Sequence, residues 1–244
     1  MKRKINWVNI ANKFVLISLI ISLISVIFIL IFAPTHQSPG APFQRLKSDY
    51  VLIMLQCILG IFAMALPKIL KYKTNLIIPS NMMLLYAIFL YCAIYLGEVQ
   101  YFYYHIPHWD TILHTFSGFM LGALGFSFVL ILNKTERIPV ALSPSFVAVF
   151  AFCFSVSLGT MWEIYEFTAD GLLATNMQKY AAEAAVPFIG RTAVIDTMKD
   201  LVVDTLGALV MSIIGYISIK YKKGWVETLT LKFKSKKETQ EIGD

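Results

Sequence analysis

Acidic side chains recur at helical spacing near the end of this chain. In the stretch "IDTMKDLVVDTLGALV", Asp196, Asp200 and Asp204 follow one another at intervals of four. Residues four apart lie on nearly the same side of a helix, so these carboxylates form one stripe about 12 Å long. The stripe runs into apolar sequence, where charged side chains are costly and usually functional.

Two further stretches carry polar side chains at the same spacing. "WEIYEFTAD" contains Glu163, Glu166 and Asp170, and "HWDTILHTFSG" contains Asp110 and His114. Residues three or four apart share a helix face, so each stretch also presents one polar stripe. We expect the three stripes to face one another at one end of a helical bundle.

These residue types predict a metal site. Carboxylates suit hard cations, and an added imidazole favours Mn²⁺, Zn²⁺ or Fe²⁺. Carboxylates and histidine at helical spacing are also how metal sites in helical bundles are built. We therefore predict a divalent ion (Mg²⁺, Mn²⁺ or Zn²⁺), with ligands drawn from Asp110, His114, Glu166, Asp200 and Asp204. Protonation of some of these carboxylates is the alternative remedy for their repulsion.

The metal hypothesis has a catalytic form. A bound ion could activate water and polarise a phosphoryl or acyl group. In that case Glu163 is the candidate general base, and Lys199 or Arg191 is the candidate partner of the developing negative charge. The reaction class is hydrolysis or group transfer on an envelope lipid or a phospho-substrate.

Several polar residues also fit a purely structural role. Acidic residues favour helix starts and membrane interfaces, which favours this role for Glu98, Asp170 and Asp196. His105 and His108 lie in the aromatic segment "YFYYHIPHWD", which is typical of an interfacial anchor. The glycines of "SGFMLGALG" predict close helix packing beside His114.

The composition predicts an all-α, polytopic membrane protein. Of 244 residues, 57% are hydrophobic and 15% are charged, and the mean hydropathy is +0.67. Apolar runs of about 20 residues are long enough to cross a bilayer, whereas a β-barrel shows short alternating segments. We expect span two to stop near Pro67. The six predicted spans are 14–32, 50–66, 76–96, 110–132, 144–166 and 200–219.

Positive charges predict the orientation. Sixteen Lys and Arg residues flank one set of helix ends and five the other, which places both termini in the cytoplasm. The expected divisions are a cytoplasmic segment 1–13, a six-helix domain 14–220 and a basic cytoplasmic tail 221–244. The first apolar run is longer than a signal-peptide core, so we expect it to stay uncleaved. The net charge of +6 then needs no nucleic-acid partner, and the bilayer is the expected partner.

Three of these stretches carry a resemblance. The segments "WDTILHTFSGF", "WEIYEF" and "IDTMKDLVVDTLGA" resemble the YjdF-type family of bacterial inner-membrane proteins, domain of unknown function 2238. The likeness covers about residues 80–220, and the layout is more distantly similar to VanZ-like membrane proteins. It implies a bacterial cytoplasmic membrane location and six family-typical positions: Asp110, His114, Glu163, Glu166, Asp196 and Asp200. The last loop departs from the family pattern: it reads "PFIGRTAVID", so the polar partner that the family has there is either missing or replaced by Arg191.

The sequence leaves three functions open. The first is the metal-dependent membrane enzyme. The second is a cation- or proton-coupled transporter component, since acids within membrane spans mark ion pathways. The third is a non-catalytic envelope accessory protein whose acidic vestibule binds a partner.

Overall fold

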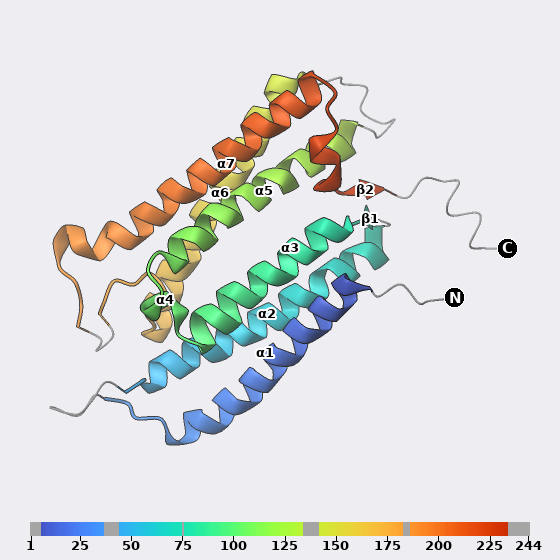
Figure 1. Cartoon of the computed structure of the whole chain (residues 1–244). Coiled ribbons are helices and arrows are strands. Elements are labelled where there is room, and N and C mark those ends of the chain that lie inside the picture. Colours follow the sequence, from blue (N-terminus) through green and yellow to red (C-terminus); the bar gives the residue numbers. More distant parts are fainter. Residues whose placement is uncertain (1–5, 37–43, 75, 134–141, 183–185, 234–244) are drawn as a thin grey trace.

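Six long apolar segments dominate the fold (Figure 1). The structure is a computed structural model that describes residues 6–36, 44–74, 76–133, 142–182 and 186–233. Each segment is long and apolar enough to cross a membrane, which confirms the predicted all-α, six-helix polytopic fold. The segments are α1 (Trp7–Phe32), α2 (Lys47–Thr74), α3 (Ser80–Leu90) with the π-helix η1 (Tyr91–Val99), α5 (Trp109–Asn133), α6 (Pro144–Leu173), and α7 (Ile195–Lys220) preceded by η2 (Gly190–Val194).

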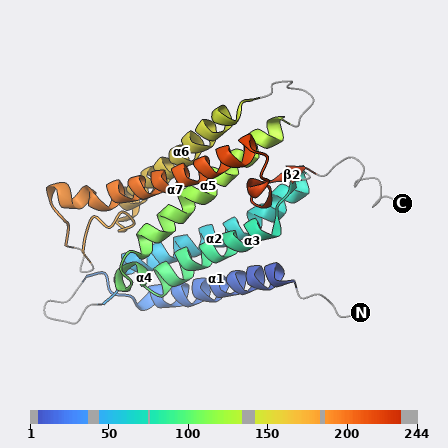
Figure 2. The same cartoon turned by 45° about the horizontal axis from the view of Figure 1, so that its top comes forward.

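The long helices form two groups, α1 to α3 and α5 to α7 (Figures 1 and 2). One core joins α1, α2 and the span made of α3 and η1 through buried residues such as Leu19, Cys57 and Ile94. A second core joins α5, α6 and α7 and contains Phe126, Val147 and Met211. The polar stripes predicted from the sequence all belong to the second group.

The helix α6 is fixed at both ends by local chemistry. The Ser143 hydroxyl accepts a hydrogen bond from the backbone of Phe146, and Pro144 occupies the first turn, where its missing N–H costs nothing. The helix ends only at Leu173, past the predicted limit of 166, because Glu166 and Asp170 are buried against the rest of the protein. Ala174 then adopts a left-handed conformation and starts the loop that leads away from α6.

The expectation that the second span stops near Pro67 is wrong. The helix α2 continues through Pro67 to Thr74. A proline inside a helix leaves the carbonyl four residues earlier without its usual donor, and membrane helices tolerate this where a neighbour supplies one. Here that carbonyl belongs to Ala63, and the Tyr86 hydroxyl donates to it at 2.9 Å.

The third span changes its winding before it reaches the polar region. It is α-helical to Leu90 and continues as a nine-residue π-helix to Val99. At Gly97, an added Cβ would overlap the Tyr103 ring, so only glycine lets the next segment fold back this closely. Tyr101 turns the chain with a left-handed φ of 68°, and the short helix α4 (Phe102–His105) follows.

The chain after α7 packs against the bundle at the end away from the polar stripes. The short helix η3 (Trp225–Thr228) buries Val226 in the second core, and the backbone of Leu231 donates to the Ser127 hydroxyl at 3.0 Å. The strands β1 (Leu76–Ile77) and β2 (Lys232–Phe233) then pair antiparallel (Figure 1). The first part of the predicted basic tail is therefore packed, and its lysines after 233 lie outside the described residues.

Candidate metal centre

The polar stripes of α5, α6 and α7 meet at one end of the bundle, called here the acidic end. His114, Glu163 and Asp204 come from three different helices and are each less than a tenth exposed. Nδ1 of His114 lies 3.1 Å from Oδ2 of Asp204 and 4.0 Å from Oε1 of Glu163. The structure thus confirms that the three stripes face one another.

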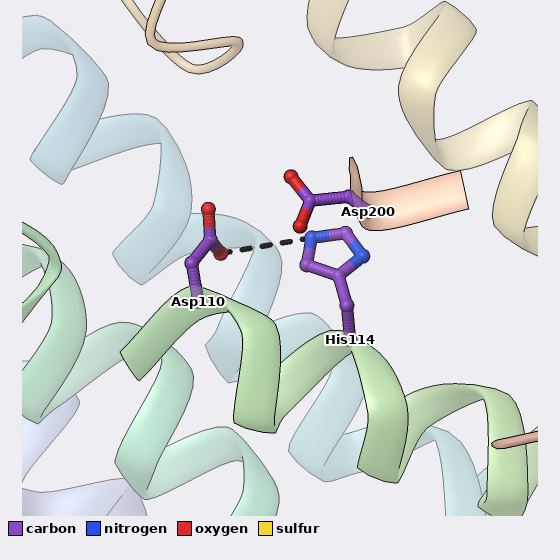
Figure 3. A group of neighbouring side chains, drawn as sticks. All are labelled: Asp110, His114 and Asp200. Atoms are coloured by element: carbon purple, nitrogen blue, oxygen red, sulfur yellow. Dashed lines mark ion pairs between the residues drawn. The ribbon is translucent and has the colours of Figure 1, made fainter. Parts of the chain in front are cut away.

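The two nitrogens of His114 have different partners. Nδ1 pairs with Asp204, whose other oxygen accepts a hydrogen bond from the Ser117 hydroxyl at 2.7 Å. Nε2 points the other way and lies 3.6 Å from Oδ1 of Asp110 (Figure 3). A carboxylate partner on Nδ1 favours the tautomer with the proton there, which leaves the Nε2 lone pair free for a metal.

Asp110, His114 and Asp200 form a group suited to a metal ion. Each offers one ligand atom, and these three atoms all lie within 4.8 Å of one another (Figure 3). Ligands of one transition metal stand about 2.0–2.2 Å from it, so the spacing needs only a small contraction. Asp200 is 2% exposed, and its Oδ1 has no hydrogen-bond partner among the described residues. A buried orphan carboxylate oxygen is costly, and a cation would satisfy it.

Glu163 and Glu166 flank this group from α6. Both carboxylate oxygens of Glu163 are buried and lack a hydrogen bond within the described part of the chain. Glu166 differs, since its Oε1 accepts a hydrogen bond from Nε1 of Trp162 at 2.9 Å. Glu163 is therefore the carboxylate of this pair with both oxygens free to take up a proton.

Asp170 has a structural role. Its carboxylate accepts hydrogen bonds from the Thr175 hydroxyl and from the backbone of Met177 and Gln178, at 2.7–3.0 Å. These three bonds fold residues 174–178 back over the end of α6. The geometry agrees with the structural interpretation of Asp170 from its interfacial position.

Lys179, which sequence reasoning missed, reaches toward the acidic end from this loop. Its ammonium lies 4.9 Å from the ring centre of Tyr103 and 5.1 Å from that of Tyr104. Burial alone would lower the pKa of Lys179, but the carboxylates of Glu98, Asp110 and Glu166, together with the Tyr104 hydroxyl, raise it above its ordinary value. Lys179 therefore stays charged. It is one of only five Lys and Arg residues on the less basic side of the predicted topology, and that scarcity is the sequence signal from which its role could have been predicted.

The two cations singled out from the sequence sit differently. Arg191 is exposed in the turn η2, and Lys199 is half-buried on α7 beside Asp196. In the described ranges, the ion pairs within 4.0 Å all involve His114, so neither cation is paired with a site carboxylate. His105 and His108 are exposed, and His105 packs edge-on against Tyr101 as an interfacial anchor would.

Glycines bring the helices of the site together. A Cβ on Gly118 of α5 would overlap the Asp204 backbone, and one on Gly207 of α7 would overlap the Thr115 carbonyl. On α6, a Cβ at Gly159 would lie 2.9 Å from Oδ2 of Asp204. Gly118 belongs to the small-residue segment predicted to pack closely, whereas Gly159 and Gly207 were not anticipated.

Comparison with known proteins places these residues in a family. The family described as "Predicted membrane protein (DUF2238)" matches residues 14–221. The chain belongs to the DUF2238 family. A relative from Thermotoga maritima, described as an uncharacterized protein, is 32% identical over 157 residues, which are 62% of this chain and 69% of the relative. No solved structure matches the chain.

The DUF2238 match is wider than the resemblance seen in the motifs. That resemblance was expected over about residues 80–220, whereas the family match includes the first two spans as well. Both helix groups are therefore part of the DUF2238 fold. Every predicted site residue lies within the matched range, and the more distant likeness to VanZ-like proteins stays a prediction.

Proposed function

We propose that this DUF2238 protein binds a divalent metal ion at its acidic end and uses it in hydrolysis or group transfer. The observation that carries the proposal is the convergence of ligand atoms from Asp110, His114 and Asp200 within 4.8 Å. The orphan oxygen of Asp200 supports it, because a buried carboxylate without a donor calls for a cation. Mg²⁺, Mn²⁺ and Zn²⁺ all fit this ligand set, and imidazole favours the last two.

The surrounding residues have distinct roles in this proposal. Asp204 holds the imidazole of His114 through Nδ1, so we assign it as an orienting residue in place of a ligand. Glu166, held by Trp162, shapes the α6 side of the site. Glu163 keeps both oxygens unpaired and is the candidate general base. The ion would supply an acidified water and a Lewis acid for a phosphoryl or acyl oxygen.

The positive-inside count supports an outward-facing site. If both termini are cytoplasmic, the acidic end lies at the outer leaflet of the bacterial plasma membrane. A substrate there would be an envelope lipid or a phospho-compound carried by one. The charges of Arg191 and Lys199 lie on the same side and are candidate contacts to such a substrate.

Charge placement favours a local site over an ion pathway. Beyond His114 in α5, before Glu163 in α6, and between Asp204 and Lys220 in α7, the helices carry no charged side chain. Ionisable groups within membrane spans commonly mark an ion or proton pathway, and here the acidic groups of α5, α6 and α7 are confined to one end. The acidic group therefore fits a reaction site at one membrane face better than a channel through the bundle.

Metal content tests the proposal. The full chain, purified in lipid nanodiscs and dialysed against Mn²⁺ or Zn²⁺, should retain about one ion per chain, as expected for one three-ligand group. His114→Ala should lose the ion, and His105→Ala, an exposed histidine at the same end, should keep it. Retention of the ion in His114→Ala, or its absence from the unsubstituted protein after dialysis, would contradict the proposal.

A further inference from the structure

The loop after α6 is built to hold one side chain. Besides the three hydrogen bonds to Asp170, Asn176 clamps the loop with its side chain. Its amide donates to the Ala181 carbonyl and the Tyr104 hydroxyl, and its oxygen accepts from the Ala181 backbone. Lys179 lies inside this clamp with a left-handed φ of 49°, a conformation that is uncommon and costly for a residue other than glycine.

The Lys179 ammonium is held in place mainly by aromatic rings. Its hydrogen bond within the described chain goes to the Asn176 carbonyl at 3.4 Å, which is long. In the same residues no carboxylate lies within 4.0 Å of it. An ammonium carries three donors, so Lys179 has donors to offer a ligand.

Tyr103 packs against this lysine beside the metal centre. Gln178, the residue before Lys179, joins the loop to α7 three residues before Asp200, because its amide donates a hydrogen bond to the Thr197 hydroxyl at 2.9 Å. The Tyr103 ring lies against Lys179 on one side and fills the space above Gly97 of the π-helix on the other. Burial and the charges of Asp110, Glu98, Glu166 and Asp200 raise the pKa of its hydroxyl well above the ordinary value. The hydroxyl therefore stays protonated and can donate a hydrogen bond.

Charge balance indicates what would bind there. A divalent ion held by Asp110 and Asp200 is neutralised by its own ligands, whereas Glu98 and Glu166 still face Lys179 but form no ion pair with it within 4.0 Å among the described residues. The Lys179 ammonium is then a cation without a direct carboxylate contact among those residues beside a hard Lewis acid, and its N–H donors are available to a ligand. A phosphoryl group has oxygens for both, because lysine binds phosphate as a point charge and hard cations bind its oxygens.

We propose that Lys179 and Tyr103 form an anion subsite that holds a phosphoryl group of the substrate next to the metal centre. The proposal rests on the proposed metal-dependent function and names its substrate class. It places substrate recognition in the loop 174–181 and the short helix α4. Neither element supplies a metal ligand, so the subsite can be removed while the ion stays bound.

Paramagnetic broadening of a phosphate signal tests whether the subsite can be removed while the ion stays bound. The full chain in zwitterionic nanodiscs is loaded with Mn²⁺, its metal content is measured, and the ³¹P line of added inorganic phosphate is followed. Phosphate bound beside Mn²⁺ should broaden strongly. Lys179→Gln should weaken phosphate affinity by about tenfold, the effect of one hydrogen bond to a charged group, with unchanged Mn²⁺ content. Lys47 is an exposed lysine on the same side of the bundle, and Lys47→Gln should leave the phosphate affinity unchanged.

A second variant guards against loss of the loop fold. Tyr103→Phe keeps the ring that fills the space above Gly97 and removes only the hydroxyl, so it should weaken phosphate by about threefold to tenfold. Equal affinity in both variants and the unsubstituted protein would overturn the subsite. A Mn²⁺-loaded protein that does not broaden phosphate would overturn it too, and would leave the metal function standing. If the unsubstituted protein retains no Mn²⁺, the proposed metal-dependent function is contradicted, and so is the subsite that rests on it.

The source of the phosphoryl group is resolved by a second set of nanodiscs. Discs that contain a lipid phosphomonoester should suppress the broadening of inorganic phosphate if the lipid headgroup occupies the subsite. Unchanged broadening in these discs would assign the subsite to a soluble phosphate compound.

Discussion

Nδ1 of His114 and Oδ2 of Asp204 lie 3.1 Å apart, although the two residues are 90 positions apart in the chain. The pair joins α5 to α7 inside the bundle and fixes which ring nitrogen faces Asp110 and Asp200. Because the second Asp204 oxygen is held by Ser117, the carboxylate has little freedom to turn. The metal hypothesis depends on this pair, since a rotated imidazole would not present Nε2 to the ligand group.

Asp204→Asn should weaken metal binding without abolishing it. The amide keeps the shape of the carboxylate but loses the charge that raises the basicity of the imidazole. Loss of such a partner reduces metal affinity by about 10–100-fold. Titration of the apoprotein with Mn²⁺ measures the change. Glu227→Gln, an exposed acid at the opposite end of the bundle, is the control and should bind Mn²⁺ like the unsubstituted protein. Normal affinity in Asp204→Asn would show that His114 does not need this partner.

Gly207→Ala should separate α5 from α7. Its methyl group would overlap the backbone carbonyl of Thr115, which cannot move aside as a side chain can. Overpacking of this kind costs about 1–3 kcal/mol and should also weaken metal binding, because His114 and Asp200 would move apart. The measurement is the melting temperature in nanodiscs, together with Mn²⁺ affinity.

Gly171→Ala provides a matched comparison for that variant. Gly171 lies in the helix α6, and nothing stands within 4 Å of the position that its Cβ would take. Alanine is the better helix former by about 1 kcal/mol, so this variant should melt at or above the temperature of the unsubstituted protein. Equal melting temperatures for the two alanine variants would contradict the close helix contact at Gly207.

Asp170→Ala should destabilise the fold and leave the ion in place. The substitution removes three hydrogen bonds to a carboxylate and frees the loop 174–178, at a cost of about 2–3 kcal/mol. Asp170 touches none of the proposed ligands, so Mn²⁺ content should not change. Thr175→Val removes only one of these bonds and should cost about 1 kcal/mol. Loss of the ion in Asp170→Ala would place this residue in the metal centre instead.

The charge of Lys179 should stabilise the protein at neutral and moderately alkaline pH. The groups that face it are the carboxylates of Glu98, Asp110 and Glu166 and the hydroxyl of Tyr104. Its folded pKa is raised above the ordinary value of 10.5, so its contribution is fully present below that value and is lost only as pH rises through the folded pKa. The melting-temperature difference between the unsubstituted protein and Lys179→Gln should therefore stay constant from about pH 7 to about pH 9. A difference that disappears within this range would show that Lys179 loses its proton early.

The sequence predicted which stripes carry the site because helical spacing is a local property. Asp200 and Asp204 share a face of α7 by their spacing alone. Their different roles, ligand and orienting partner, depend on how far α7 is rotated toward His114. Gly118, Gly159 and Gly207 set that rotation through contacts between helices, which the spacing along one helix cannot show.

Two other features depended on long-range contacts in the same way. The place of Lys179 follows from the Asp170 carboxylate folding the loop back and from rings on α4, 75 or more positions earlier in the chain. The continuation of α2 through Pro67 depends on a hydroxyl from α3 that reaches the Ala63 carbonyl. The α4 rings are far in sequence from Lys179, and the α3 hydroxyl is far from Ala63. Patterns within one segment therefore could not predict either contact.

The coordination of bound Mn²⁺ shows whether His114 is a ligand of the ion. Electron spin-echo spectroscopy of the Mn²⁺-loaded protein detects imidazole nitrogens bound to the ion. We predict the coupling of a single histidine nitrogen, which should be absent from His114→Ala and unchanged in His105→Ala. Bound Mn²⁺ without any nitrogen coupling, or with a coupling that survives in His114→Ala, would contradict this prediction.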